Sequence, residues 1–499
     1  MIKSVLDYLE NSVEKYPNKI AVTDINKGYT YAEVLELSKK IGSYLHIKGL
    51  KNNQPVVVFL NKEADAIPAF WGATYAGGIY VPLDTKAPID RLKLILDVLQ
   101  PALLITKQPL MEKAYQLVDA SKVILFEEAV KAEIREAELT QIQKQRIDTD
   151  PLYIICTSGS TGIPKGVVIS HRAVIDFTEE ASEAMNFSDG EIFANQAPFY
   201  FDASVPDLYC TIYNGATLHI IPEEWFSFPI RVLEYIKEQK VNAIFWVPTA
   251  LIVAANLRAI REVDVTCLKK IMFCGEVMPV KQYNMWKKAV PEAKFVNYYG
   301  PSETTYASTY YVIDRAFTND QVLPVGKAAN NTGVLILDEK NKACEKGEVG
   351  ELCIRGSGVA LGYYNNPEKT AEAFVQNPLN PQYRDIMYRT GDLVKCNEND
   401  EIEYIGRKDN QIKHMGYRIE LGEIEAAAAS AAGIERVCCV YKNNCIYMYY
   451  NGKSNEQELL TYMKSKVPDY MVPGQVKQLE QLPLNSNGKI DRLLLKNME

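Results

Sequence analysis

A loop rich in glycines and hydroxyls follows a strand-like run and ends on a lysine. It lies within residues 153–167, which read Tyr-Ile-Ile-Cys-Thr-Ser-Gly-Ser-Thr-Gly-Ile-Pro-Lys-Gly-Val. Glycine lets the backbone approach an anion, hydroxyl and amide groups donate to phosphate oxygens, and Lys165 adds a positive charge. The spacing is not that of a Walker loop, in which Gly-Lys-Ser/Thr opens a helix. The ordered residues favour a nucleotide phosphate loop over an ordinary polar turn.

Asp202 lies in an aromatic part of the sequence, with Phe193, Phe199, Tyr200 and Tyr209 around it. A carboxylate buried among rings is costly unless it pairs with a cation, either a protein Lys or Arg or the ammonium group of a ligand. An aspartate in a turn is also a common helix cap. The residues alone leave both interpretations open.

Two further turns carry groups that could bind a nucleotide. In residues 297–304, a tyrosine offers a flat face to a base, Glu303 is an oxygen ligand suited to Mg²⁺, and Thr304 could donate to a phosphate. Asp392 follows Thr390-Gly391 and is placed to accept hydrogen bonds from sugar hydroxyls. Each turn also has an ordinary interpretation, a Gly-Pro turn with a capping acid in the first and a plain turn aspartate in the second.

The last third of the chain adds a charged segment and a loop lysine. Residues 406–420 are crowded with charged side chains, and Lys489 stands in a polar loop over residues 484–491. A lysine at the tip of a loop is ordinarily solvated surface. By itself, Lys489 therefore indicates nothing about chemistry.

The elements that would position these groups alternate between strands and helices. Residues 55–60 are apolar throughout, which is typical of a strand buried on both faces of a parallel sheet. Ligand groups in such sheets follow the carboxyl ends of the strands. Residues 127–146, with mixed Lys and Glu, are expected to form one solvated helix. The other expected strands are 20–22, 29–31, 77–84, 103–105, 241–248 and 270–276, and the expected helices include 5–16, 32–46 and 91–99.

The second half becomes rich in β-structure and then changes again. Strands are expected within 350–356, 362–364 and 388–393, and a compact α+β unit follows, with helices at 421–432 and 456–466 around two strands within 437–450. The predicted fold class is therefore α/β: a large N-terminal domain with mainly parallel sheets plus a β-rich part, and a small α+β C-terminal domain, which the family resemblance given below implies is mobile. The predicted limits of the two domains are residues 1–407 and 408–499.

Composition narrows the function classes. The 499 residues include 47% hydrophobic and 24% charged side chains, as in a soluble globular protein, and no apolar run is long enough to cross a bilayer. A net charge of −8 argues against a nucleic-acid polymer as the main partner. Four histidines and ten scattered cysteines leave little material for a His-based triad or a zinc site. The acidic start of the chain argues against export, so we expect a cytoplasmic protein.

The motifs occur in one order along nearly the whole chain, and that order resembles the adenylate-forming superfamily. The resemblance is to the amino-acid adenylation domains of nonribosomal peptide synthetases, and within them to the stand-alone D-alanine-carrier protein ligases. The motifs that carry it are residues 29–33, 76–82, 157–166, 201–202, 299–303, 350–352, 390–392, 406–420, 468–473 and 487–489.

The resemblance implies two half-reactions. ATP and a carboxylate would give an aminoacyl-adenylate and pyrophosphate, with Mg²⁺ as the metal, and the acyl group would then pass to the phosphopantetheine thiol of a carrier protein. Lys489 would bridge the substrate carboxylate and the ATP phosphate, Asp409 would be a hinge, and the segment at Gly416 would reach the thiol channel. The implied catalytic residues are Lys489, Glu303, Thr157, Lys165 and Arg407, and Glu303 is also the implied metal ligand.

The same resemblance implies a nucleotide-binding set. Tyr299 would stack on adenine, and Asp392 would bind the ribose hydroxyls beside Arg407. The implied set is Thr157, Ser158, Gly159, Ser160, Thr161, Gly162, Asn297, Tyr298, Tyr299, Gly300, Ser302, Thr304, Asp392 and Arg407. Ser302 departs from the threonine that is more usual in this motif.

Asp202 gains a partner from the resemblance, because its position binds the α-ammonium in members that activate amino acids. Bulky neighbours would leave room for a small side chain, and D-alanine is the preferred substrate, with glycine, L-alanine or serine as alternatives. Tyr298 and Tyr306 are bulkier than expected for a D-alanine ligase. The implied substrate-binding residues are Asp202, Ala203, Pro206, Phe245, Met272, Cys274, Tyr298, Tyr306 and Lys489.

Two other function classes remain in view. An acyl-CoA synthetase or luciferase-like oxidase is disfavoured by Asp202, and a non-catalytic binding module is disfavoured by the retained Lys489, Glu303 and Asp392. Because the sequence stops shortly after Lys489, we expect the carrier protein to act in trans, unless the chain is a domain excised from a larger synthetase. We also expect the enzyme to be a monomer. No membrane or nucleic-acid partner is expected.

Overall fold

The computed structural model describes residues 2–159, 163–484 and 490–498. The chain divides by its internal contacts into two compact units. The first unit comprises Met1–Thr85, Gln100–Ile155 and Val167–Lys408, and the second comprises Lys86–Leu99, Cys156–Gly166 and Asp409–Glu499. The predicted domain limits, 1–407 and 408–499, stay a prediction.

The largest sheet has nine strands in the order β15-β14-β13-β12-β11-β9-β10-β1-β2. The run from β13 to β1 is parallel, and antiparallel strands close both edges. The strands are β1 (Ile20–Thr23), β2 (Gly28–Thr30), β9 (Ile192–Asn195), β10 (Thr217–Ile220), β11 (Ala243–Trp246), β12 (Lys270–Phe273), β13 (Lys294–Tyr299), β14 (Thr309–Val312) and β15 (Lys327–Ala328).

A second sheet has seven strands in the order β18-β8-β7-β4-β3-β5-β6, and its pairings from β7 to β6 are parallel. All residues of β3 are buried, as its unbroken apolar sequence predicts. The strands are β3 (Pro55–Phe59), β4 (Ile79–Pro82), β5 (Leu103–Thr106), β6 (Val123–Leu125), β7 (Pro151–Thr157), β8 (Lys165–Ser170) and β18 (Gly362–Tyr363).

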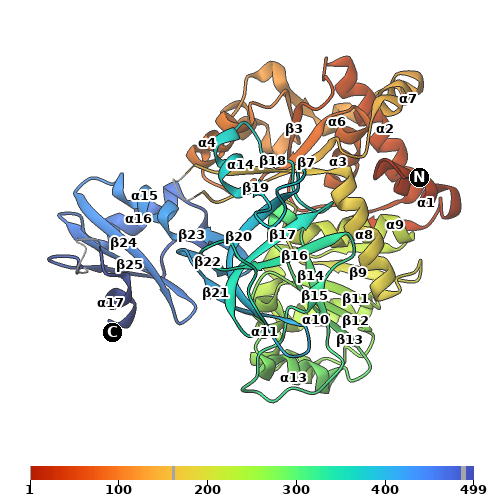
Figure 1. The fold of residues 1–499 in the computed structure, drawn as a ribbon. Coiled ribbons are helices and arrows are strands. Elements are labelled where there is room, and N and C mark those ends of the chain that lie inside the picture. Colours follow the sequence, from red (N-terminus) through yellow and green to blue (C-terminus); the bar gives the residue numbers. More distant parts are fainter. Residues whose placement is uncertain (1, 160–162, 485–489, 499) are drawn as a thin grey trace. The chain divides into compact units, whose positions relative to one another are not determined.

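Helices cover these sheets (Figure 1). Helix α2 begins at a capping box, in which the Thr30 and Glu33 side chains each accept from the other residue's backbone N–H. The helices are α1 (Leu6–Lys15), α2 (Tyr31–Ile47), α3 (Ala66–Tyr75), α4 (Ile89–Leu99), α5 (Met111–Tyr115), α6 (Phe126–Ala129), α7 (Glu136–Gln145), α8 (His171–Met185), α9 (Val205–Asn214), α10 (Pro229–Glu238), α11 (Pro248–Asn256), α12 (Ala259–Glu262), α13 (Val280–Ala289) and α14 (Pro367–Ala373).

The β-rich part is a five-stranded sheet with antiparallel pairing throughout. Its central strands are β17 and β20, and β20 carries Asp392. The strands are β16 (Thr332–Leu337), β17 (Val349–Gly356), β19 (Phe374–Gln376), β20 (Ile386–Cys396) and β21 (Ile402–Arg407).

The second unit contains the α+β structure expected near the C-terminus. Strands β24 and β25 form the predicted hairpin, and its turn residues Asn443 and Asn444 both have positive φ, as a two-residue hairpin turn requires. Strand β26, which the sequence analysis missed, pairs in parallel with β25. The elements are β22 (Gln411–His414), β23 (Tyr417–Glu420), α15 (Leu421–Ala429), β24 (Ile434–Lys442), β25 (Cys445–Gly452), α16 (Glu456–Lys466), β26 (Gln475–Gln478) and α17 (Arg492–Asn497).

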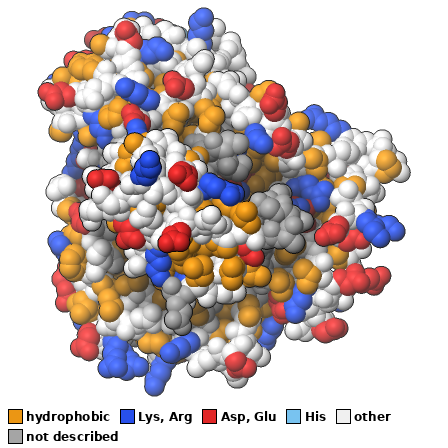
Figure 2. Space-filling model, turned by 90° about the vertical axis from the view of Figure 1, so that its left-hand side faces the viewer, with side chains coloured by type: hydrophobic (Ala, Val, Ile, Leu, Met, Phe, Trp, Pro, Cys, Tyr) orange, Lys and Arg blue, Asp and Glu red, His pale blue; other side chains and the backbone are white. Residues whose placement is uncertain are grey.

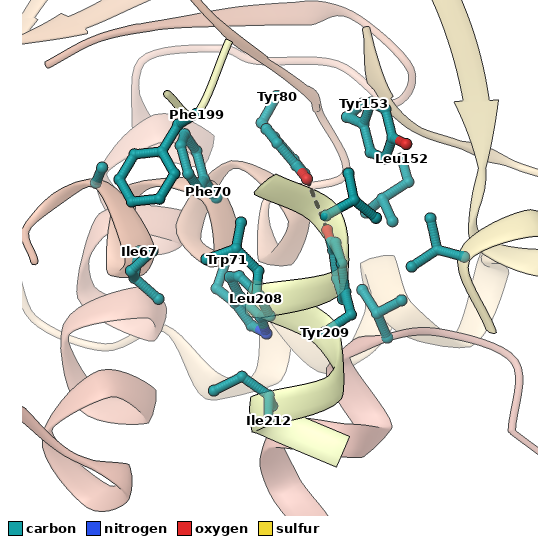
Figure 3. Close-up of a cluster of buried hydrophobic side chains, with 14 of the residues drawn as sticks. Ile67, Phe70, Trp71, Tyr80, Leu152, Tyr153, Phe199, Leu208, Tyr209 and Ile212 are labelled. Atoms are coloured by element: carbon teal, nitrogen blue, oxygen red, sulfur yellow. Dashed lines mark hydrogen bonds between the residues drawn. The ribbon is translucent and has the colours of Figure 1, made fainter. Parts of the chain in front are cut away.

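The main hydrophobic core draws on both large sheets and on helices α3, α8 and α9. Figure 3 shows part of it, where Leu208 and Tyr209 of α9 lie against Trp71 of α3. The Tyr209 and Tyr80 hydroxyls are 2.7 Å apart, which satisfies two buried polar groups at once. Helix α9 is therefore fixed between the sheets, and this matters because Asp202 lies just before it.

The α/β class with mainly parallel sheets and a β-rich part is confirmed, but one element prediction was wrong. Residues 127–146 form two helices, α6 and α7, instead of one. The segment between them turns where the Arg135 N–H donates to Ser43 Oγ at 2.8 Å. Tertiary hydrogen bonding therefore decides a break that the charge pattern does not show.

Two properties of the described residues bear on partners. None of their helices is both long enough and apolar enough to span a bilayer. On the face drawn in Figure 2, acidic and basic side chains are interspersed with apolar ones. This mixture agrees with the modest net charge of −8.

Candidate functional site

The side chains of Tyr299, Asp392 and Arg407 meet at the junction of the largest sheet and the β-rich sheet. Tyr299 ends β13 and its hydroxyl donates to Asp392 Oδ2. Arg407, directly opposite Asp392 across β20 and β21, donates from NH1 to Asp392 Oδ1 at 2.9 Å. Burial raises the pKa of Tyr299, and the Asp392 carboxylate raises it further. The structure thus brings together three residues that the sequence analysis assigned to adenosine binding.

Glu303 lies on the loop after β13 and is completely buried. Its Oε1 accepts from the Tyr363 hydroxyl at 2.8 Å. Thr304, predicted as a phosphate donor, instead donates its hydroxyl to Pro301 O at 3.2 Å and accepts from Ser308 Oγ at 2.7 Å. The Thr304 hydroxyl therefore holds the loop together, while Glu303 is the carboxylate that the loop presents.

Gly300 allows this loop to fold back on itself. A Cβ atom there would lie 2.5 Å from Tyr306 O and 2.7 Å from Ala307 Cα. Thr305 and Tyr306 both have positive φ, which is unusual for bulky residues and indicates a conformation held by its surroundings. The sequence of this motif therefore encodes a tight loop that carries both Glu303 and Tyr306. Asn297, also predicted to bind nucleotide, donates its amide to Pro324 O at 2.8 Å.

Glu351 is a site residue whose role the sequence analysis missed. Its buried carboxylate accepts from Arg389 Nε at 2.8 Å, from Lys408 Nζ at 2.8 Å and from the Gly391 N–H at 3.1 Å. Burial alone would raise the pKa of Glu351, but the bonds from Arg389 and Lys408 outweigh it, and the pKa is lowered. Glu351 therefore ties the turn before Asp392 to the residue after Arg407. The Gly-Glu-Leu motif was recognised in the sequence, but these partners were not.

The residues predicted to bind the amino acid gather in one hydrophobic cluster. Phe245 of β11, Met272 of β12 and Tyr298 of β13 come from neighbouring parallel strands, and Cys274 and Tyr306 follow in loops. The ring centroids of Phe245, Tyr298 and Tyr306 are 6.1 to 6.3 Å apart. Pro206, in the first turn of α9, is also buried. These side chains therefore lie together, and their role in binding the amino acid stays a prediction.

Asp202 begins the 3₁₀ turn η3 (Asp202–Ser204) that leads into α9, and both it and Ala203 are partly exposed. It lies within electrostatic range of two buried phenols, because its charge contributes to the raised pKa of Tyr153 and of Tyr306. Burial is the main cause of both shifts. Asp202 is therefore a carboxylate at the border of an aromatic cluster, as an ammonium ligand would be.

A small cavity also borders this cluster. Its volume is about 10 Å³, which is close to the space of one water molecule, and Phe177, Tyr298 and Ala307 line it. The Tyr298 hydroxyl is buried and has no hydrogen-bond partner in the described part of the chain. The tyrosines thus fill most of the space behind the strand ends.

The described part of the phosphate loop belongs to the second unit. Ser158 Oγ donates to Arg418 O at 3.0 Å, and the Gly159 N–H donates to Glu423 Oε2 at 3.3 Å. The Gly159 N–H, which was predicted to bind phosphate, therefore donates to a carboxylate in this structure. Lys165 begins β8 and is partly exposed. Ser160, Thr161 and Gly162 lie outside the described residues.

The predicted hinge and thiol-channel residues lie at the start of the longest segment of the second unit. Asp409 accepts from the Gln411 N–H at 3.1 Å. Met415 and Gly416 both have positive φ and join β22 to β23 in a two-residue turn. Lys489 lies outside the described residues, so its predicted role stays a prediction, as do the roles of Asp409 and Gly416.

The residues present fit ATP and Mg²⁺. Thr157 Oγ1 is buried and has no hydrogen-bond partner among the described residues, which leaves a donor available at the end of β7. Asp392 and Arg407 form a polar pair beside the Tyr299 ring. Glu303 offers a carboxylate, and Mg²⁺ in nucleotide sites is commonly held by one or two carboxylates together with phosphates. When bound, the metal would supply positive charge beside the phosphates.

A nucleotide site at strand ends of a parallel sheet defines a class of ATP-using enzyme, and comparison with known proteins identifies the family. Residues 9–364 match the family of AMP-binding enzymes. The match covers well over half of the chain. This protein belongs to the AMP-binding enzyme family, whose members are adenylating ligases that use ATP and Mg²⁺.

Related sequences are parts of much longer proteins. The chain is 32% identical over 506 residues to Gramicidin S synthase 2 of Brevibacillus brevis, which covers 100% of this chain and 11% of the relative. It is 31% identical over 497 residues to Gramicidin S synthase 1 of the same organism, with 98% of this chain and 44% of the relative covered. The chain therefore spans less than half the length of these curated relatives.

Solved structures agree on the fold. The Vibrio cholerae adenylation domain AlmE in complex with glycyl-adenosine-5'-phosphate superposes with a TM-score of 0.85 at 22% identity, covering 99% of this chain and 97% of that one. NpsA-ThdA, an artificially fused adenylation-PCP di-domain from Klebsiella oxytoca, gives a TM-score of 0.82 at 22% identity, covering 96% and 94%. Both likenesses show an adenylation-domain fold for this chain.

Proposed function

We propose that this enzyme activates a small amino acid with ATP and passes it to the phosphopantetheine thiol of a carrier protein. The first step forms an aminoacyl-adenylate and releases pyrophosphate. The observation that carries the proposal is Asp202, a carboxylate at the border of the cluster formed by Phe245, Tyr298 and Tyr306. An ammonium group is a favourable partner for a partly buried carboxylate such as that of Asp202, whereas a fatty or aryl acid offers it no cation.

The side-chain volume supports a small substrate. The rings of Phe245, Tyr298 and Tyr306 come from three segments and pack with their centroids 6.1 to 6.3 Å apart, which leaves little room for a substrate side chain. D-Alanine is our preferred substrate, with glycine, L-alanine and serine as alternatives. The AlmE structure, which holds a glycyl adenylate, shows that such a fold accommodates the smallest amino acid in that protein.

The residues would act as follows in the first step. Tyr299 and Asp392 would hold the adenosine, Glu303 the metal, and Thr157 the phosphates, while Asp202 would orient the amino acid by its ammonium group. Positioning two reactants in this way removes the entropic cost of bringing them together. Lys489 would carry positive charge to the reacting carboxylate and phosphate, where negative charge develops.

Pyrophosphate exchange into ATP across a panel of D- and L-amino acids tests the proposal. We expect exchange with one or a few small amino acids, and at least about 100-fold less with the Asp202→Ala variant, because a charged hydrogen-bond partner of the ammonium is lost. Asp264→Asn, an exposed substitution far from the cluster in sequence, is the control. Exchange supported only by aryl or fatty acids would contradict the proposal and favour an acyl-CoA synthetase.

The acceptor can be tested separately. A phosphopantetheinylated carrier protein supplied in trans should become aminoacylated, while the same carrier without its phosphopantetheine should not. Rapid acyl transfer to free coenzyme A but not to any carrier would support the alternative class.

A further inference from the structure

A fully buried acid and amide face each other beside the predicted amino-acid site. Asn195 is the last residue of β9, Asp207 lies in the first turn of α9, and both have 0% exposure. Asn195 Nδ2 donates to Asp207 Oδ2 at 2.8 Å. The other oxygens of the pair, Asn195 Oδ1 and Asp207 Oδ1, are buried without a hydrogen-bond partner among the described residues. Two acceptors are thus left without a donor in the dry interior.

One proton would satisfy both oxygens. A hydroxyl on Asp207 Oδ1 can donate to Asn195 Oδ1 while Asn195 Nδ2 donates back, which closes a reciprocal acid–amide pair. Leaving both acceptors unpaired would cost the full desolvation of each group. We propose that Asp207 is held as the neutral acid in this pair, and that the pair is a positioning element for Asp202.

Burial favours the neutral form of Asp207 more than the nearby positive charge favours the ionised form. Lys62 is the cation whose charge acts on Asp207, but its ammonium group donates to the carbonyls of Asn195 at 3.2 Å, Gln196 at 2.7 Å and Ile221 at 2.8 Å. Two other titratable groups lie near Asp207. Tyr306 comes from the loop after β13, and Cys210 lies on the same helix as Asp207. Burial raises the pKa of Asp207 well above its usual range, although Asn195 and Lys62 oppose the shift.

The N-terminus of α9 works in the opposite direction. A helix N-terminus stabilises an anion only weakly, whereas burying an unpaired carboxylate is strongly unfavourable. Burial therefore outweighs the helix dipole. The hydrogen bond between Asn195 and Asp207 and their two unpaired oxygens favour the neutral acid, and the raised pKa of Asp207 agrees with this state.

The pair matters for function because it joins the two ends of the segment that carries Asp202. Residues 196–206 run from the end of β9 to the start of α9, and Asn195 and Asp207 close this segment. Helix α9 is in turn fixed by Leu208, Tyr209 and Ile212 in the core shown in Figure 3.

The charge of Asp207 is the second reason why the acid–amide pair matters for Asp202. The carboxyl groups of Asp202 and Asp207 both lie within electrostatic range of the Tyr306 hydroxyl. With Asp207 neutral, Asp202 supplies the negative charge that selects one ammonium group. This functional part of the inference rests on the proposed amino-acid substrate, whereas the protonation state does not.

The protonation state can be tested by stability alone. A carboxyl group whose pKa is raised in the folded state loses stability as pH rises from about 3.9 towards the folded pKa. Asp207→Asn keeps a reciprocal amide pair and removes this loss. We therefore expect the melting temperature of D207N relative to wild type to increase by about 2 °C or more between pH 5 and pH 8.

The exposed Asp264 provides a matched control. Its carboxylate accepts from the Thr266 N–H at 3.0 Å, and this bond lowers its pKa, so the effect of D264N should stay constant between pH 5 and pH 8. A D207N difference that is constant, or that becomes less favourable as pH rises, would show that Asp207 is ionised and would overturn the proposal.

Exchange kinetics test the positioning role. We expect D207N to keep kcat/KM for the amino acid within about threefold of wild type, because the pair survives. Asn195→Asp places two acids together, so its KM for the amino acid should rise at least about tenfold at pH 8, recover partly at pH 6, and leave the KM for ATP unchanged. Equal loss of exchange in D207N and D202N would show that the charge of Asp207 is required.

The experiments can reject the neutral state of Asp207 and the proposed function independently of each other. If the stability signature appears but no amino acid supports exchange, the acid–amide pair stands and the proposed function is wrong. If amino-acid exchange is found without the signature, the function stands and the neutral acid is rejected. Should N195D fail to fold, D207N alone decides the protonation state.

Discussion

Asp392 is bound from two sides, by the Tyr299 hydroxyl and by Arg407 NH1 at 2.9 Å. It is almost completely buried, so its carboxylate can serve a ligand only at its remaining lone pairs. Such a fixed acceptor suits a pair of sugar hydroxyls, because it needs no rearrangement when they bind. At the residue scale, the side chains of the predicted adenosine site therefore already hold one another in place.

Asp392→Asn tests this assignment. A hydrogen bond to a charged group contributes about 1.5–3 kcal/mol, so losing the bonds from the ribose hydroxyls to this carboxylate should raise the KM for ATP about 10- to 100-fold in pyrophosphate exchange. Tyr299→Phe keeps the ring and should change the KM for ATP less than about tenfold. If D392N raised the KM for the amino acid and left that for ATP unchanged, the ribose assignment would be wrong.

At the element scale, loops between well-packed strands hold the functional side chains. The loop after β13 carries Glu303 and Tyr306, and it closes tightly because Gly300 has no side chain. The Glu351 carboxylate on β17 accepts hydrogen bonds from the Arg389 side chain and the Gly391 N–H of β20. It also accepts one from Lys408. These contacts fix the loops to rigid strands, which gives the site its precision.

Gly300→Ala should disturb this loop. The new Cβ would lie 2.5 Å from the Tyr306 carbonyl oxygen, so the backbone must shift. We expect a loss of about 1–3 kcal/mol of stability and at least about tenfold lower exchange activity. Gly190→Ala is a matched control, since the nearest atom there is Ser188 Oγ at 3.4 Å. Equal exchange activity in the two variants would mean that the loop tolerates the shift.

At the scale of the whole molecule, buried histidines make stability depend on pH. Burial lowers the pKa of His219 to about 4, and its Nδ1 is 2.9 Å from the Tyr235 hydroxyl. Because the folded pKa lies below the unfolded value of about 6.5, the stabilisation is present above pH 6.5 and is lost as pH falls towards 4. His171, also buried, acts in the same direction.

Replacing His219 with Gln should reduce this acid sensitivity. Linkage from the two pKa values gives about 2 kcal/mol less stability at pH 5 than at pH 7 from His219 alone. We therefore expect the H219Q variant to lose about 2 kcal/mol less than wild type between these pH values in urea unfolding. His46→Gln, at a partly exposed position, is the control. An unchanged pH dependence in H219Q would contradict the assignment.

The two proposed half-reactions also depend on the whole molecule. Lys489→Ala should reduce amino-acid-dependent exchange by at least about 1000-fold, because positive charge at the reacting phosphate is lost. Transfer from preformed adenylate to the carrier should largely survive. Equal loss of both activities would show that Lys489 is needed for folding or for both steps.

Much of the fold and site could be predicted from local sequence. The apolar run of β3, the capping box at Thr30 and the hairpin turn at residues 443–444 each depend on neighbouring residues, so the chain specifies them directly. The ordered motifs likewise predicted that Tyr299, Asp392 and Arg407 would share a site, and that Phe245, Met272 and Tyr298 would line one substrate pocket.

The tertiary structure decided what depends on residues far apart in the chain. It alone paired Glu351 with Arg389 and Lys408, broke residues 127–146 into two helices, and set Asn195 against Asp207 in a buried acid–amide pair. Each of these outcomes depends on which groups lose water together. A sequence fixes the chemistry of its side chains, but burial and partners, which determine charge and hydrogen bonding, are fixed only when distant segments pack.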